Sequence, residues 1–168
     1  MFINWLKDII DKGSICSEYT NKINSALSKK QIVDIGLDAN GISFLLEIGS
    51  KGVEVPYYCI ERDFHNFING NYVFESKPNK KGFTYTTELY CNYSDKEPIN
   101  VRTTAISLLN SIARLTIKDY SCNSIYIDTN SFAEITIPDN AFCNIHLYGN
   151  ASVKINGSNS KVKIKRWA

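Results

Sequence analysis

The chain has 168 residues, of which 43% are hydrophobic and 21% charged, and its formal net charge is +2 at pH 7. This length fits one large domain or two small ones, and the composition is too apolar for a disordered chain. The small net charge argues against a protein that wraps DNA and equally against an acidic DNA mimic, although it excludes no local charged patch.

The N-terminal stretch MFINWLKDIIDKG lacks the basic segment and clean apolar segment of a secretory signal peptide. No apolar run reaches the roughly 18 residues that a membrane span needs. Five cysteines, an odd number without a CxxC spacing, favour reduced and mostly buried thiols over a disulfide framework or a zinc site. We therefore expect a cytoplasmic protein without membrane contact.

Short helices are predicted for the N-terminal part of the chain. Apolar residues at helical spacing predict helices near residues 2–12, 17–27, 28–39, 42–48 and 56–64. Asn40-Gly41 is interpreted as the left-handed stop of the third helix. The third and fourth helices fit a helix-turn-helix only poorly, because the fourth is too apolar to read DNA. We predict a helical head over residues 1–67.

Turn and strand signals follow. Asn69-Gly70 lies between apolar residues and predicts a β-hairpin. A second turn at Pro78–Gly82 leads into FTYTTELYC, whose alternation predicts a strand with Leu89 and Cys91 on its buried face. Another strand is expected around Ile106–Leu109.

A repeat occupies Leu115–Ile164. Its lines are LTIKDYSCNS, IYIDTNSFAE, ITIPDNAFCN, IHLYGNAS, VKINGSNSK and VKI, which start ten, ten, ten, eight and nine residues apart. Each line opens with two apolar residues separated by one position. The pairs Leu89/Cys91 and Ile99/Val101 fit the same spacing, so the repeat is expected to start near residue 85.

Inward apolar pairs followed by polar turns are typical of a β-solenoid, in which stacked strands about 4.8 Å apart bury a continuous core. A coil of two or of three strands is compatible with the spacing, and we favour three. An antiparallel meander is the alternative. The predicted fold class is α+β: a helical head, then a hairpin and β-solenoid over residues 68–168.

The last strand is basic. Its lysines alternate, as expected where charged side chains protect a sheet edge from aggregation. The alternative is a basic face for phosphate, nucleic acid or an acidic partner, but no aromatic residues are expected among the lysines. Trp167 is expected to cover the open end of the core. The basic residues are Lys154, Lys161, Lys163, Lys165 and Arg166.

Candidate chemistry is sparse. Glu61, Asp63 and His65 form the densest polar cluster, and Glu61 and His65 could share a metal or a proton across one helical turn. Two ligands do not make a site, and a solvated helix face is favoured. His146 is predicted to point outward from its strand. We predict no catalytic residues, no metal and no cofactor.

An enzyme that acts on glycans would need paired carboxylates on one strand face. The outward residues of the predicted strands include no such pair, and the acidic residues are expected at corners. They are Asp119, Asp128, Glu134 and Asp139.

The segments CSEYTNKINSALSKKQIVDIGLDANGISFLLE, DFHNFINGNYV, GFTYTTELYC and IPDNAFCNIHLYGNASVKI resemble uncharacterised small proteins carried by phages and prophages of gut Bacteroidetes. The resemblance covers roughly residues 16–160. It implies a phage-encoded accessory protein of the host cytoplasm with a helical head and a solenoid tail, and it assigns no functional residues.

We therefore expect a non-catalytic interaction protein that binds a protein partner rather than nucleic acid, for example to block a host defence complex. A virion or assembly component that forms a homo-oligomer and a small β-helix enzyme acting on glycan or nucleic acid are the alternatives. The expected binding surface lies in the head and hairpin, at Glu61, Asp63, His65, Asn69, Gly70 and Tyr72.

Overall fold

The structure is a computed structural model that describes residues 2–11, 17–26, 31, 35, 39–56, 71–75, 86–94, 97–157 and 161–167. The helices are α1 (Phe2–Asp11), α2 (Ser17–Asn24) and α4 (Ala39–Ser50). The strands are β1 (Asn71–Glu75), β2 (Thr86–Cys91), β3 (Ile99–Val101), β4 (Ala105–Leu109), β5 (Ile112–Ile117), β6 (Cys122–Ile127), β7 (Phe132–Ile137), β8 (Phe142–Tyr148), β9 (Ser152–Gly157) and β10 (Val162–Trp167).

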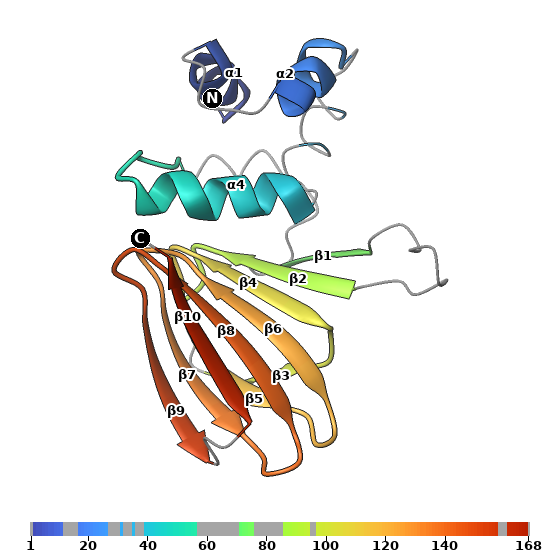
Figure 1. Ribbon diagram of the computed structural model, residues 1–168, viewed down its shortest axis with the longest axis vertical. Coiled ribbons are helices and arrows are strands. Elements are labelled where there is room, and N and C mark those ends of the chain that lie inside the picture. The colour runs from blue at the N-terminus through green and yellow to red at the C-terminus, as the bar shows by residue number, and fades with distance from the viewer. Residues whose placement is uncertain are drawn as a thin grey trace.

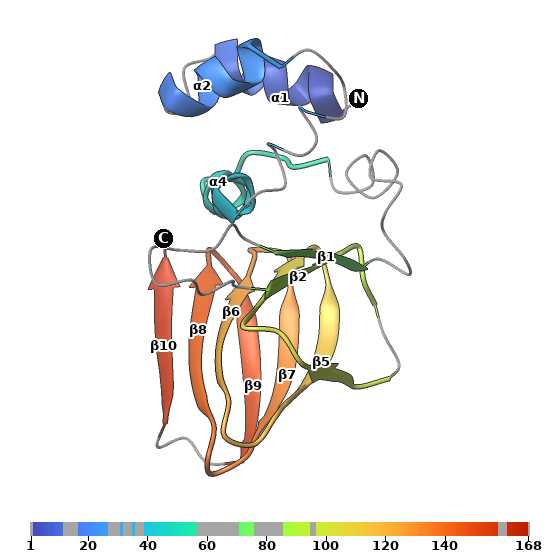
Figure 2. The same cartoon turned by 90° about the vertical axis from the view of Figure 1, so that its right-hand side faces the viewer.

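The strands form a parallel β-solenoid of about four turns. One sheet has the order β1-β2-β4-β6-β8-β10, and the other has the order β3-β5-β7-β9. All pairs are parallel except β1 with β2, which are antiparallel and lie on either side of the predicted turn at residues 78–82. Figure 2 shows the two sheets face to face, with α4 above one end of the strands. The α+β solenoid architecture is confirmed.

Each coil contains two strands. Leu115 of β5 pairs with Ile135 of β7, and Ile125 of β6 pairs with Ile145 of β8, so equivalent residues are 20 positions apart in these coils. The preference for a three-sided coil was therefore wrong, since that coil would have placed residue 145 beside residue 115. The antiparallel meander is also excluded for β2 to β10, because these strands pair in parallel.

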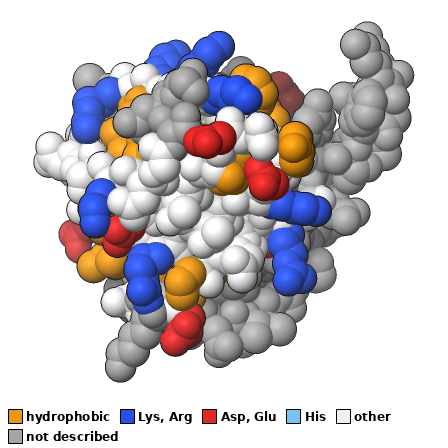
Figure 3. All heavy atoms as spheres, turned by 90° about the horizontal axis from the view of Figure 1, so that it is seen from below, with side chains coloured by type: hydrophobic (Ala, Val, Ile, Leu, Met, Phe, Trp, Pro, Cys, Tyr) orange, Lys and Arg blue, Asp and Glu red, His pale blue; other side chains and the backbone are white. Residues whose placement is uncertain are grey.

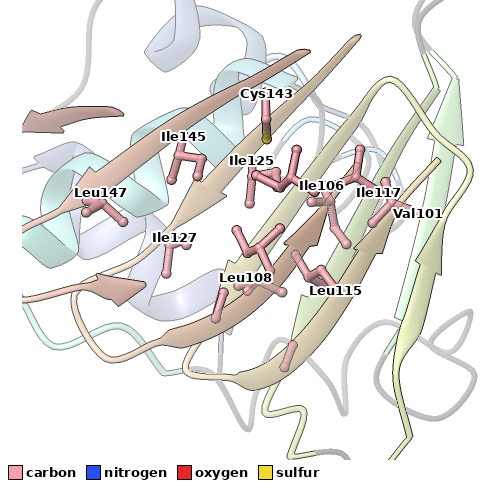
Figure 4. Packing of buried hydrophobic residues seen from close by; sticks show 14 of the residues in the cluster. Val101, Ile106, Leu108, Leu115, Ile117, Ile125, Ile127, Cys143, Ile145 and Leu147 are labelled. Carbon is pink, nitrogen blue, oxygen red and sulfur yellow. The ribbon is translucent and has the colours of Figure 1, made fainter. Parts of the chain in front are cut away.

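Ladders of aliphatic residues fill the space between the two sheets (Figure 4). One ladder joins Ile106, Ile125, Ile145 and Ile164 on adjacent strands of the larger sheet. The first three are buried, whereas Ile164, on the outermost strand, is 53% exposed. This burial of apolar surface between stacked strands is the main contribution to the stability of the solenoid.

In β2, the first strand of the solenoid, the side that faces the solenoid core is the opposite of the one that we predicted. Tyr90 points into the solenoid core, and Leu89 and Cys91 pack in a second core with the helices. The pairing of Leu89 with Ser107 and of Tyr90 with Leu108 accounts for this, because neighbouring residues in a strand face opposite sides. Ile99/Val101 and the strand at Ile106–Leu109 follow the prediction.

The second core lies between the larger sheet and the helices. Figure 1 shows α4 directly above the sheet, with α1 and α2 above α4. Its buried residues come from all three helices, from the segment that follows α4 and from the outward side of the sheet. They are Leu6, Ile23, Ile42, Leu45, Leu46, Ile48, Val55, Leu89, Cys91, Leu109 and Tyr148.

Asn40 and Gly41 do not end a helix, as we predicted, but lie in the first turn of α4. Gly41 is buried, and the predicted fourth helix forms the rest of this longer element. The second helix ends at Asn24, short of the prediction. The other predicted helical segments, most of residues 28–38 and all of residues 57–64, lie outside the described residues.

Polar side chains form hydrogen bonds at the turns of the solenoid near α4. Asp128 is fully buried, and its Oδ1 accepts hydrogen bonds from the backbone N–H groups of Asn110 and Asn130 and from the Ser131 hydroxyl. The Asn110 side-chain amide donates to Asn92 Oδ1 across one coil. These bonds satisfy backbone groups that leave the strand ladder at each turn.

Candidate functional site

The outward side of the larger sheet changes in character from strand to strand. Leu109 on β4 is fully buried under the helices, whereas the outward positions of β8 and β10 carry aromatic and basic side chains. The register sets them in rows across the sheet, and we call this set the aromatic–basic patch. It consists of Tyr126, His146, Tyr148, Lys163, Lys165 and Trp167.

The aromatic rings of the patch stack along the sheet. The rings of Tyr126 and His146 lie 4.6 Å apart at 19°, close to the spacing of adjacent strands. Trp167 continues the stack beside both Tyr148 (6.0 Å, 8°) and His146 (6.1 Å, 20°), and its Nε1–H donates to His146 Nδ1 at 3.2 Å. Trp167 therefore lies on the outer face of the sheet and does not cover the end of the core, which corrects the prediction.

The two lysines of the patch lie on the same side of β10 as Trp167. Lys165 Nζ lies 3.3 Å from the centroid of the Trp167 ring, a cation–π contact. Lys163 is the next outward residue on β10, and its register partner on β8 is Asn144. Among the residues that the structure describes, no carboxylate forms an ion pair with Lys163 or Lys165.

The other predicted basic residues have separate roles. Lys154 Nζ lies 2.6 Å from Glu134 Oε1, and Glu134 lies within β7 rather than at a corner. The hydrogen bond from Lys154 is the largest of the effects that lower the pKa of Glu134. Lys161 lies over the Phe142 ring at 5.1 Å. The predicted basic patch is thus divided, and only Lys163 and Lys165 belong to the aromatic–basic patch.

Arg166 points toward the interior side of the sheet, since its register partner is the buried Leu147. Its Nη1 donates to the carbonyl oxygens of Gly149 (2.9 Å) and Ala151 (3.1 Å). A guanidinium group here satisfies two corner carbonyls, and it places a charge next to the end of the apolar core.

Burial in the stack changes the pKa of two patch residues. Desolvation, followed by the positive charge of Lys165, lowers the pKa of His146. Desolvation, followed by Tyr126 and Glu47, raises the pKa of Tyr148, which is 8% exposed. The neutral imidazole matches the hydrogen bond that it accepts from Trp167, because a protonated Nδ1 could not accept one.

One edge of the β10 backbone has no pairing strand in the part of the chain that the structure describes. The carbonyl oxygens of Lys161 and Trp167 accept hydrogen bonds from Cys143 and Gly149 on the β8 side. Because N–H and C=O groups alternate in direction along a strand, those of Val162, Ile164 and Arg166 face away from β8. No described strand pairs with that side, and Figure 2 shows β10 at the margin of its sheet.

Most of the predicted binding surface is not described. Glu61, Asp63, His65, Asn69 and Gly70 lie outside the described residues. Tyr72 lies in β1, where its backbone pairs with Leu89, and its side chain is not described. The prediction that the head and hairpin form the active surface therefore stays a prediction.

The sequence analysis placed His146 on the outward side of its strand but did not bring the aromatic members of the patch together. The signal was present, since Tyr126, His146 and Lys165 are 20 and 19 residues apart, and Tyr148 and Trp167 are 19 apart. It becomes visible only when the repeat lines are compared two lines at a time. Our preference for three strands per coil concealed this relation.

At the opposite end of the molecule, the chain turns near residues 118–121 and 138–141. The view of this end from below (Figure 3) shows no surface like the aromatic–basic patch. Figure 3 shows acidic and basic side chains intermixed there, with apolar side chains in small separate groups. Tyr120 and Phe142 are the exposed aromatic residues of these turns. Intermixed charges of this kind are common on a solvated surface.

Among the described residues, no group of three or more His, Cys, Asp or Glu side chains is placed to hold a metal ion. Cys91 and Cys143 are buried free thiols and Cys122 is exposed; burial raises the pKa of Cys143 to about 12. In the described part of the chain, no helix is both long and apolar enough to cross a membrane.

Comparison with known proteins gives no further assignment: no protein-family model, no curated protein and no solved structure matches the chain.

Proposed function

We propose that this chain is a non-catalytic interaction protein, and that the aromatic–basic patch is where its protein partner binds. The observation that carries the proposal is that exposed Lys163 and Lys165 lie on the same side of the outermost strand as Trp167, with Lys165 against its ring. Tryptophan and tyrosine often dominate the binding energy of protein interfaces, and a rigid sheet presents them with little loss of conformational entropy.

The stack fixes the geometry of the patch before any partner binds. Trp167 is 37% exposed, is held by Tyr148 and His146, and donates a hydrogen bond to His146. A side chain that is ordered in the free protein loses less rotamer freedom on binding, so more of its contact energy contributes to affinity. Lys163 and Lys165 add a positive field that would favour an acidic partner.

The resemblance of residues 16–160 to proteins of gut Bacteroidetes phages and prophages supports a partner in the bacterial host cell. The form of the proposal that we put first is an accessory protein that binds a complex of the host, for instance one that defends against phages. In this account the solenoid is the scaffold, and α4 fixes the sheet on one side of the patch.

The test is affinity capture from a lysate of a gut Bacteroidetes strain with three forms of the protein. The wild type is compared with Lys163→Glu/Lys165→Glu and with the control Arg102→Glu/Lys118→Glu, which makes the same change in net charge elsewhere. Arg102 and Lys118 are exposed and directly follow β3 and β5 of the other sheet.

We expect the wild type and the control to recover the same stoichiometric partner. The patch variant should recover at least about tenfold less of this partner, because its introduced carboxylates would repel an acidic surface. Recovery of no stoichiometric partner by the wild type would contradict the proposal. Equal recovery by all three forms would place the binding surface outside the patch, in agreement with the expectation from sequence for the head and hairpin.

A further inference from the structure

Resting on the proposed function, we infer that the partner docks an extended segment onto the free edge of β10, with acidic side chains at every second position. The segment adds one strand to the larger sheet. Its backbone bonds to Val162, Ile164 and Arg166, and its carboxylates face Lys163 and Lys165. This names both the mode of binding and the chemistry of the partner.

The backbone provides the first argument. The N–H and C=O groups of Ile164 face away from β8, and no described strand bonds to them. A row of such groups at a sheet edge is a template for another strand, and main-chain hydrogen bonds to it give affinity that depends little on sequence. The edge is also regular, since β10 pairs with β8 in unbroken register from Val162 to Trp167.

The interior side of the same edge provides the second argument. Val162 is only partly buried and Ile164 is 53% exposed, whereas their register partners on β8, Cys143 and Ile145, are buried. Val153 and Ile155 of β9 are also only partly buried beside them. Apolar residues at alternate positions of a docked segment would remove this surface from water, as each coil does for the one before it.

The outward side selects the charge of the segment. In the other sheet, Glu134 of β7 lies opposite Lys154 of β9 in register, and their side chains form an ion pair at 2.6 Å. Lys163 and Lys165 have no such carboxylate among the described residues. A neighbouring strand with Glu or Asp at its outward positions would repeat the arrangement already present one sheet away.

The same charges oppose a second copy of the chain as the occupant. In a symmetric dimer of two β10 edges, Lys163 and Lys165 of one copy would meet the equivalent lysines of the other. Like charges directly opposite one another destabilise a strand pair. Arg166, which turns inward to Gly149 and Ala151, limits the apolar contact to the part of the edge at Val162 and Ile164.

The direct test uses a fluorescein-labelled peptide of about eight residues that alternates Glu and Val, a length matched to a typical strand. Binding is measured by fluorescence anisotropy against the whole protein. A Lys/Val peptide of the same pattern is the charge control, and a Glu/Val peptide N-methylated at alternate residues is the backbone control. Of the three peptides, we expect only the unmethylated Glu/Val peptide to bind.

Two variants at one position separate the backbone from the side chain. Ile164→Pro removes an N–H group that faces away from β8, so β10 keeps its bonds to β8, whereas binding should fall by about tenfold because edge strands tolerate proline only on that side. Ile164→Ala keeps the N–H group and should reduce binding about threefold. Lys163→Glu/Lys165→Glu should reject the Glu/Val peptide and accept the Lys/Val peptide, which keeps the test valid if Ile164→Pro does not fold.

The outcomes distinguish this inference from the proposed function. If the partner from the lysate is lost with Lys163→Glu/Lys165→Glu but is retained by Ile164→Pro, and the Glu/Val peptide does not bind, then the patch binds a folded surface and strand addition is wrong. A concentration-dependent dimer in light scattering that Ile164→Pro converts into a monomer would overturn the inference in favour of self-association. Equal binding of the Glu/Val and Lys/Val peptides would overturn the assignment of charge.

Discussion

The outward side of the larger sheet has two ends that share a backbone and differ in their side chains. At β2 and β4, Leu89, Cys91 and Leu109 are completely buried beneath the helices. At β8 and β10, the same side carries His146, Lys165 and Trp167. The inward side changes less, since isoleucine occupies one inward position in every strand from β4 to β10 of this sheet, although Arg166 of β10 replaces an aliphatic residue at another. The outward residues therefore decide whether a strand packs against the helices or is exposed to solvent.

The helices cover the sheet as far as β8, since Tyr148 of β8 belongs to the same core as α4. The outward aliphatic residues of β2 and β4 form one core with Ile42, Leu45 and Leu46 of α4. Toward β10 the outward residues become basic, and burying an unpaired ammonium group under a helix would be costly. The change from apolar to basic residues thus limits how much of the sheet the helices cover.

The largest effect should come from truncating the covered end. Leu109→Ala removes a fully buried side chain from the core beneath the helices and should lower the free energy of unfolding by about 2–5 kcal/mol. The matched change on the same side at the open end, Lys163→Ala, should alter it by no more than about 0.5 kcal/mol, as for most exposed positions. Urea unfolding followed by circular dichroism measures both values.

Similar losses in the free energy of unfolding for the two variants would contradict the comparison, because they would mean that Lys163 contributes as much to stability as Leu109. A loss for Leu109→Ala well below this range would mean that the helices contribute little to the stability of the solenoid.

A smaller effect concerns the pH dependence of the patch. His146 should titrate below its ordinary value of 6.5, chiefly because of desolvation and secondly because of Lys165. A pKa lowered by folding means that the unfolded chain takes up the proton first. The stability from neutral His146 is therefore fully present above pH 6.5 and is lost as the pH falls through the lower value in the folded state.

Proton NMR of the His146 ring measures this pKa directly. Trp167→Ala should move it back toward 6.5, because the substitution opens the ring to water and removes the Nε1–H donor that favours the neutral form. Lys165→Gln should move it in the same direction by less, since the charge of Lys165 is the second cause. An unchanged pKa in Trp167→Ala would show that the stack does not control His146.

The interior of the solenoid could be predicted from the sequence, whereas the patch could not. Inward positions such as Ile125 and Ile145 recur in every line of the repeat, and a strand of period two leaves them only one face to bury. The neighbours of an outward residue depend instead on the length of the coil. His146 lies beside Lys165 only because two strands make one turn, and the spacing of single lines is equally compatible with three.

Local signals failed where tertiary contacts outweighed them. Asn40-Gly41 is a strong stop signal in isolation, but here Gly41 is buried and Ile42, Leu45 and Leu46 are fixed against the sheet, which holds the segment in α4. The alternation at Leu89 and Cys91 was correct as a strand signal. Which of its two faces meets the solenoid core was decided by the register with β4, which the strand alone does not contain.

Residue-resolved amide exchange of β10 tests the central claim most directly, namely that this strand has a free edge that an acidic segment occupies. In the free protein, the amides of Ile164 and Arg166 should exchange quickly and those of Lys163 and Lys165 slowly, since only the latter face β8. On addition of the Glu/Val peptide, Ile164 and Arg166 should become protected. Slow exchange at all four residues in the free protein, or no added protection at Ile164 when the peptide is bound, would contradict the account.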